Sequence, residues 1–367
     1  MSAISLENVP KRRLNSGLLL LIVGMLIAPW LASAAGGNYW VRVIDFTLLY
    51  IMLALGLNIV VGFTGLLDMG FIAFYAVGAY LAALLASPHL LDAFPALQPM
   101  FSHGMHTSYL WLVPLGAFVA GICGILLGAP TLGLRGDYLA IVTLGFGEII
   151  RILMRNLDRP VNITNGAKGI SGIDSLNLFG LKFSGTYHLL GQKIPALYLW
   201  YYLFALLIAV IIFICLRLQH SRIGRAWHAI REDEDVARAM GINVRNFKLL
   251  AFALGASFGG VAGVMFASFQ GFVSPESFTL NESIVVLAMV VLGGIGHVPG
   301  VILGAVLLSA LPEVLRSQAI PLQQALFGSV IIDPEILRQL FYGLALVLVM
   351  LFRPHGLWPV RHPGVPS

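Results

Sequence analysis

The strongest constraint on how this chain folds is a series of apolar runs that are long enough to cross a membrane. Candidate spans occupy roughly residues 17–35, 43–61, 65–87, 109–130, 138–154, 197–216, 249–270, 284–296, 299–315 and 337–352. Only 11% of the 367 residues are charged, whereas a soluble domain carries about 25%. The sequence therefore predicts an all-α polytopic membrane protein with about ten transmembrane helices, some of them short or broken.

The distribution of basic residues predicts which side of the membrane each loop faces. With the N-terminus inside, the inner segments carry 13 Lys and Arg and the outer segments carry seven. Because inner loops are enriched in these residues, we expect both termini to lie inside. The run 17–35 follows Lys11-Arg12-Arg13, and Ala32-Ser33-Ala34 resembles a signal-peptide cleavage site. Since the run is longer than the usual signal-peptide core, we expect a retained first span.

One polar segment, residues 217–248, interrupts the apolar sequence. It holds seven of the 22 Lys and Arg and four of the 17 acids. Its centre predicts a short helix with acids in the first turn, a left-handed glycine cap and an apolar face suited to a groove. The residues concerned are Glu232, Asp233, Val236, Ala237, Met240 and Gly241. At about 1.5 Å per residue such a helix is too short to span a membrane. It fits a docking element on the cytoplasmic side, and an ordinary solvated loop is the alternative.

The longest outer segment, residues 155–195, predicts a small β-hairpin on the membrane surface. It contains the turn-forming pairs Asn165-Gly166, Lys168-Gly169 and Ser171-Gly172 and one alternating stretch at 176–179.

Three stretches place a small residue at every fourth position, which predicts close helix contacts. They are Gly116, Ala120, Gly124 and Gly128; Ala251, Gly255, Gly259 and Gly263; and Gly296, Gly300 and Gly304. On a helix each forms a flat stripe along which another helix can approach. Packing within the chain is the expected use, and a subunit interface is the alternative.

Two segments, 58–70 and 293–300, combine glycines and polar residues between apolar runs and so predict helix breaks. Irregular backbone is tolerated at membrane depth only beside protein or a watery cavity, and exposed helix ends can bind the charged groups of a zwitterion. A tight cytoplasmic turn is the other interpretation of each. The candidate residues of a substrate path are Asn58, Gly62, Thr64, Gly65, Asp68, Glu148, Gly293 and Gly296. Glu148 is included as an intramembrane acid, with Arg151 at i+3 as a possible partner.

Several signatures of chemistry are missing from the sequence. It has no phosphate-binding loop of the form G-x-x-x-x-G-K-[ST], no polar cluster of nucleophile and base, and no spacing typical of metal ligands. Cys123 and Cys215 both lie in apolar runs. We therefore expect a protein that is not an enzyme and that uses no cofactor and no metal.

With these features located, the sequence resembles a known family, the permease subunits of branched-chain amino-acid ABC importers, specifically the longer of the two paired subunits. The matching stretches are residues 54–80, 134–151, 164–173, 221–256 and 291–305. The resemblance implies one permease domain over 1–367, with a core at 43–352, an external loop at 155–195 and a cytoplasmic coupling loop at 217–248. It implies a multi-pass protein of the bacterial inner membrane that moves branched-chain amino acids.

The resemblance also implies partners: a second permease subunit, two ATPase subunits that hydrolyse ATP, and an external solute-binding protein. It implies that Glu232 to Gly241 is the helix that an ATPase subunit grips. Ala237, Ala239 and Gly241 match the core of the usual coupling signature, but its Leu-Pro ending is absent. Permeases for urea and short amides share these stretches and remain an alternative. On the residues alone, an ion-coupled secondary amino-acid carrier is a further alternative.

Overall fold

The computed structural model describes residues 16–94, 107–134, 136–178, 181–189 and 192–327, with scattered residues of 333–358. The long helices are α1 (Ser16–Gly36), α2 (Asn38–Asn58), α3 (Ile72–Leu85), α5 (Tyr109–Thr131), α6 (Asp137–Asn156), α7 (Ala196–Gln219), α10 (Val244–Gln270), α11 (Leu280–Gly293) and α12 (Val298–Phe327). The shorter elements are α4 (His89–Ala93), α8 (Arg222–Glu232), α9 (Glu234–Ala239), the π-helix η1 (Ile59–Phe63) and the 3-10 turns η3 (Gly166–Lys168) and η4 (Pro275–Ser277).

Nine of the ten expected spans overlap with helices, while half of the tenth, 337–352, lies outside the described residues. In the described part of the chain, six helices are long and apolar enough to cross a membrane: Asn38–Phe63, Tyr109–Thr131, Ala196–Gln219, Val244–Gln270, Pro275–Gly293 and Val298–Arg316. The run in α1 and helix α3 are apolar but shorter. Helix α6 is not among the six, because three charged residues fall within any window that would span.

Helix α2 and helix α10 form the centre of the molecule. In α2 and its η1 extension, 89% of the most apolar 18-residue window is buried, against 28% in α5 and 33% in α7. Helix α10 packs most extensively against α5 and α3. The outer helices present their apolar side chains outward, as helices surrounded by lipid or by other subunits do.

The small-residue stripes serve contacts within the chain. A Cβ built on Gly124 of α5 would lie 2.7 Å from the carbonyl oxygen of Phe252 in α10, and one on Gly255 of α10 would lie 3.0 Å from that of Gly56 in α2. The third stripe brings the start of α12 against α11 in the same way. The expectation of intramolecular packing is confirmed, because only a missing side chain allows these backbones to approach so closely.

Segment 155–195 forms the expected hairpin and takes part in two further strand pairs. Strands β2 (Asn177–Leu178) and β3 (Leu181–Lys182) pair, as do β4 (Thr186–Leu189) and β5 (Gln192–Pro195), all antiparallel. Strand β1 (Ile170–Ser171) pairs instead with β6 (Phe272–Val273), which follows α10. That pairing was not predicted, since two-residue strands far apart in sequence carry no periodic signal.

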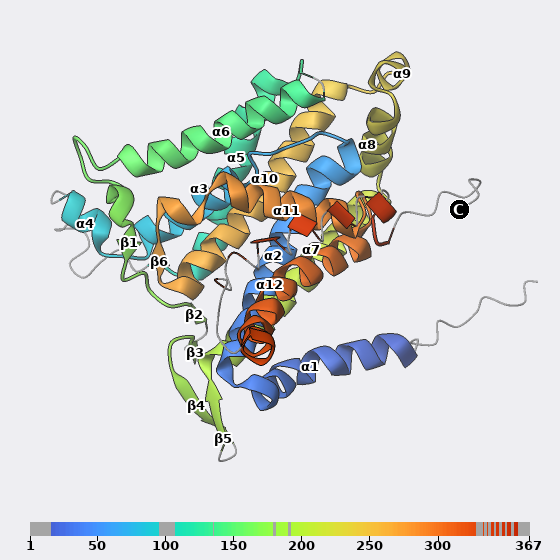
Figure 1. Cartoon of the computed structure of the whole chain (residues 1–367). Helices are drawn as coiled ribbons and strands as arrows, with labels where there is room; N and C mark the ends of the chain where they lie inside the picture. Colours follow the sequence, from blue (N-terminus) through green and yellow to red (C-terminus); the bar gives the residue numbers. More distant parts are fainter. Residues whose placement is uncertain are drawn as a thin grey trace, which may run out of the picture.

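Figure 1 shows how these elements are distributed. Helices α8 and α9 lie at one extremity of the molecule, and the hairpin β4–β5 lies at the opposite one. The fold thus separates α8 and α9 of the polar segment 217–248 from the hairpin β4–β5 of segment 155–195.

Candidate functional site

The polar segment folds as two short capped helices, where one had been expected. The Ser221 hydroxyl accepts hydrogen bonds from the Ile223 and Gly224 amides at the start of α8. The chain then turns extended at Asp233, whose carboxylate accepts from the Asp235 and Val236 amides, at 2.9 and 3.0 Å, and so begins α9. The predicted helix 232–241 is therefore wrong at its start, because Asp233 is an N-cap residue.

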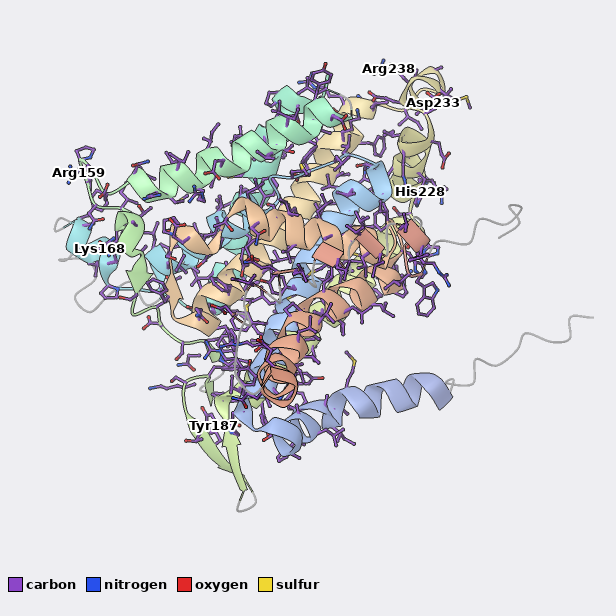
Figure 2. All side chains as sticks on the ribbon, viewed as in Figure 1. Arg159, Lys168, Tyr187, His228, Asp233 and Arg238 are labelled. Carbon is purple, nitrogen blue, oxygen red and sulfur yellow. The ribbon has the colours of Figure 1, made fainter. Side chains whose placement is uncertain are left out.

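The cap after α9 is as predicted. Met240 follows the helix, and Gly241 has φ +85°, in the left-handed region. Figure 2 labels Asp233 and Arg238 at the tip of the molecule that α9 forms, and Tyr187 on the distant hairpin. Helix α9 is thus a small, projecting element with a defined end at each side.

The apolar residues of α9 do not share one exposed face, and the expectation that they would is wrong for Ala237. Val236 is 58% exposed and Met240 is 79% exposed, whereas Ala237 is 2% exposed and packs with Ile230 and Val244. Neighbouring positions on a helix are about 100° apart, so Val236 and Ala237 point in different directions. The outward apolar surface consists of Val236 and Met240.

An ion pair joins α9 to the start of α10, and further ion pairs lie within α9 itself. The ammonium group of Lys248, whose side chain is 3% exposed, lies 2.7 Å from Glu234 Oε2. Arg238 contacts the other oxygen of Glu234 at 3.1 Å and Asp235 at 3.4 Å. Because Lys248 is buried, its bond to Glu234 leaves little freedom for α9 to move without α10.

Helix α8 joins the same region to the end of α2. Trp227 is fully buried, donates its indole N–H to the Phe247 carbonyl at 2.8 Å, and stacks on Phe63 with ring centroids 6.2 Å apart. Phe63 ends the π-helix η1. Short π-helices interrupt the regular ladder and are frequent at functional sites.

The two predicted helix breaks meet each other at this point, which we call the inner junction: Asn58, Gly62, Arg231 and Gly296. The Gly296 amide donates to Asn58 Oδ1 at 2.9 Å, and Arg231 Nη1 donates to the Gly62 carbonyl at 2.6 Å. Gly296 has φ +85°, and a Cβ on Gly62 would lie 2.8 Å from the Gly296 nitrogen. The polar segment and both breaks are therefore one connected structure.

The other candidate path residues are distributed around this junction. Gly65 packs against Arg231, Gly293 packs against α12, and Thr64 bonds the Val60 carbonyl of its own helix. Asp68 is 2% exposed and accepts from the Gly70 amide, beside α5 and α6. Glu148 is paired within α6: Arg151 donates its Nε–H to it at 3.0 Å, as its i+3 position suggested.

The sequence reasoning overlooked Asp45 on α2. It is fully buried, and among the described residues neither carboxylate oxygen has a hydrogen-bond partner. The nearby Arg42 bonds Gln270 at 2.9 Å. A lone Asp within the run 43–61 was a readable signal, because acids inside spans are rare and tend to be functional.

Comparison with known proteins places these features in a family. The family model for the branched-chain amino acid transport system permease component matches residues 39–350. The chain is 41% identical over 358 residues to the high-affinity branched-chain amino acid transport system permease protein LivM of Escherichia coli K12, covering 94% of this chain and 76% of that protein.

More distant relatives have related names. The probable branched-chain amino acid transport permease protein LivM of Methanocaldococcus jannaschii is 26% identical over 335 residues, covering 85% of this chain and 91% of that protein. The permease protein LivH of Escherichia coli K12 is 26% identical over 279 residues, covering 73% and 82%. No solved structure matches. The chain belongs to the family of permease components of branched-chain amino acid transport systems.

Proposed function

We propose that this chain is a membrane-spanning subunit of an ATP-binding-cassette importer that moves branched-chain amino acids across the bacterial inner membrane. It works beside a second permease subunit, receives its substrate from an external solute-binding protein, and is energised by two separate ATPase subunits. The relatives are named for branched-chain amino acid transport, and LivM and LivH are two distinct permease proteins of such systems. No catalysis is assigned to the chain itself.

The observation that carries the coupling role is the connection from α9 to the inner junction. Helix α9 presents Val236 and Met240 outward, and Asp233, between α8 and α9, is two residues from Arg231, which bonds Gly62. A partner that moves α9 therefore pulls on the end of α2 and on the turn before α12. In this proposal Glu232, Asp233 and Gly241 shape the element, and Ala237 anchors it to its own chain.

The topology belongs to the same proposal. Ten spans with both termini inside put 217–248 in the cytoplasm, where ATPase subunits lie, and 155–195 outside, where a solute-binding protein docks. The opposite positions of α9 and β4–β5 support this arrangement. Asn58, Gly62, Thr64, Gly65, Asp68, Glu148, Gly293 and Gly296 remain candidate path residues. The inner junction then acts as the cytoplasmic closure of that path.

The proposal is tested by reconstitution. The chain is purified with its proposed ATPase and permease partners and placed in vesicles with the cognate binding protein. We expect ATP-dependent uptake of leucine, isoleucine or valine, and no ATP hydrolysis by this chain alone. Uptake of urea or short amides without leucine would overturn the substrate. Leucine uptake that needs a proton or sodium gradient and no ATP would show a secondary carrier.

A further inference from the structure

Asp45, near the start of α2, is a buried acid to which neither the coupling role nor the candidate path gives a use. Its side chain is fully buried, and among the described residues neither carboxylate oxygen has a hydrogen-bond partner. An isolated ionised carboxylate is strongly disfavoured in such surroundings, and the group takes up a proton instead. Burial and the missing donors therefore indicate a neutral carboxyl group in this conformation.

Arg42 is the one cation close to Asp45 among the described residues. The ionisable groups that act on Asp45 are Arg42, one helical turn earlier on α2, and Tyr201 of α7. The Tyr201 hydroxyl donates to the Met25 carbonyl of α1 at 2.8 Å. The sequence of α1, residues 16–36, contains no ionisable side chain. Any change in the charge of Asp45 is therefore felt first by Arg42.

The acids of α11 and α12 lie against a different face of α2. Glu282 and Glu313 line a cavity together with Thr47 and Tyr50 of α2. Neighbouring positions on a helix are about 100° apart, so Thr47, two residues after Asp45, points to nearly the opposite side of α2. These two acids therefore do not face Asp45.

Arg42 bonds the end of α10 rather than Asp45. Its Nη2 donates to Gln270 Oε1 at 2.9 Å. Its guanidinium carbon also lies 5.8 Å from the ring centroid of Phe46 and 5.7 Å from that of Phe269, which is within the range of cation–π contacts. Arg42 therefore fastens the start of α2 to the end of α10.

Asp45 offers Arg42 a stronger alternative partner. Arg42 and Gln270 are both exposed, and a carboxylate is a better acceptor for a guanidinium group than the neutral amide oxygen of Gln270. Residues three apart on a helix are neighbours, so Arg42 can reach Asp45 once Gln270 releases it. That pairing requires an ionised Asp45. The bond to Gln270 and the proton on Asp45 therefore belong to one and the same state.

The contact between Arg42 and Gln270 lies on the side of the molecule remote from α8 and α9. Helix α10 follows α9 and is 27 residues long, which is about 40 Å. Its last residue, Gln270, is thus far from α9 (Figure 1). In the proposed orientation this is the outer end of both helices, where Arg42 meets water.

We propose that Asp45 is a proton-binding site, and that it releases its proton when Arg42 moves from Gln270 to Asp45. In the observed state Arg42 bonds Gln270 and Asp45 holds the proton. In the second state the end of α10 has separated from α2, Arg42 pairs with the Asp45 carboxylate, and the proton has passed to the water outside. Arg42 keeps its charge throughout.

The proposal rests on the proposed function and adds to it a dependence on the pH outside the cell. Acid keeps Asp45 protonated and leaves Arg42 on Gln270, whereas a higher pH favours the second state. Transport passes through both states in this proposal. Leucine uptake is therefore expected to fall as the outer pH falls.

Infrared spectroscopy detects the proton itself. The difference spectrum between the parent complex and Asp45→Asn, without ATP at neutral pH, is expected to contain the carbonyl stretch of a protonated carboxyl group, and this band should shift in D2O. Asp45→Asn keeps the shape and neutrality of the side chain, so the unfolding temperature should not change. Asp45→Leu, an apolar side chain of similar shape, replaces it where Asp45→Asn folds poorly.

Uptake measured with the pH varied on one side tests the exchange. Vesicles that hold the complex and enclose ATP take up leucine delivered by the binding protein, at a fixed inner pH and a range of outer pH. The parent is expected to lose uptake in acid. Asp45→Asn cannot ionise, so its uptake should be several-fold lower at neutral pH and should not fall further in acid.

Two further variants identify the contact responsible. Gln270→Ala frees Arg42 and so destabilises the protonated state, which should move the midpoint of the pH profile about one unit lower. Glu276→Gln is the matched control, because the Glu276 side chain is 55% exposed and contacts Arg151 and Arg155. It should keep the midpoint of the parent.

The outcomes separate this proposal from the proposed function. A parent that takes up leucine but shows no infrared band from Asp45, or whose pH profile Asp45→Asn reproduces, overturns the proton site and leaves the function standing. A midpoint that Gln270→Ala leaves unchanged or raises overturns the exchange of Arg42. A parent complex that takes up no leucine at any pH overturns the proposed function itself.

Discussion

At the scale of single residues, Gly241 needs a backbone conformation that favours glycine, although there is space for a side chain at this position. Its φ is +85°, and a Cβ built there meets nothing within 4 Å. Within this chain, the effect of a side chain at this position therefore comes from the backbone, since the left-handed region disfavours L residues and β-branched ones most.

We expect Gly241→Val to cost about 1–2 kcal/mol in backbone strain and to misplace the end of α9. The complex should insert normally, while ATP-dependent leucine uptake falls several-fold. Gly185→Val is the control, because Gly185 also has open space but no positive φ. Equal uptake by both variants would show that the α9 cap has no part in coupling.

Substitutions at Ala237 and Met240 test which surface of the α9 region a partner subunit contacts. Ala237→Asp places a carboxylate among Ile230 and Val244, where an unpaired charge is costly, so α9 should detach and become sensitive to limited proteolysis. Met240→Asp, at a position 79% exposed, should leave the proteolysis pattern unchanged and reduce co-purification of the ATPase subunit. If Met240→Asp keeps the ATPase subunit fully bound, Met240 is not part of the docking surface.

At the scale of elements, the inner junction links α2, α8 and the α11–α12 turn through two hydrogen bonds. Asn58→Ala removes the acceptor of the buried Gly296 amide, which costs about 1–3 kcal/mol. The unfolding temperature of the purified complex should fall, and the ratio of ATP hydrolysed to leucine moved should rise. An unchanged ratio in a destabilised complex would reduce the junction to a purely structural contact.

The close packing of α10 on α3 also belongs to the scale of elements, and it depends on glycines of α10. A Cβ on Gly263 would meet the Tyr75 carbonyl of α3, so Gly263→Val should separate two central helices and cost about 1–3 kcal/mol or more. Size-exclusion chromatography of the detergent-solubilised chain should show less monodisperse protein. Gly145→Ala on α6 has open space and should behave as the parent does. Normal behaviour of Gly263→Val would contradict the close packing of α10 on α3.

At the scale of the whole molecule, the two extremities should face opposite sides of the membrane. In a background without Cys123 and Cys215, single cysteines replace the exposed residues Ser171 and Met240. A membrane-impermeant thiol reagent added to intact cells should label position 171 and spare position 240. Labelling at 240 alone would reverse the orientation that the distribution of Lys and Arg predicts.

The sequence by itself determined the features that depend only on residues close together in the chain. Apolar runs of about 20 residues specify helices, and α1, α2, α5, α7 and α10 follow them within a few residues. The small-residue stripes predicted close packing, Gly241 predicted the cap after α9, and the Glu148–Arg151 pair follows from i+3 spacing. The resemblance of particular stretches identified the family that the comparison then showed.

Only the tertiary structure decided which of these features meet. Nothing in the spacing of Asn58, Arg231 and Gly296 says that they form one junction, because each bond joins residues more than 160 positions apart. Burial likewise depends on which neighbours surround a helix, which is why the inward position of Ala237 was not predicted. The cavity of about 590 Å³ between α2, α11 and α12 is the space that these helices leave between them, and local periodicity carries no information about such a space.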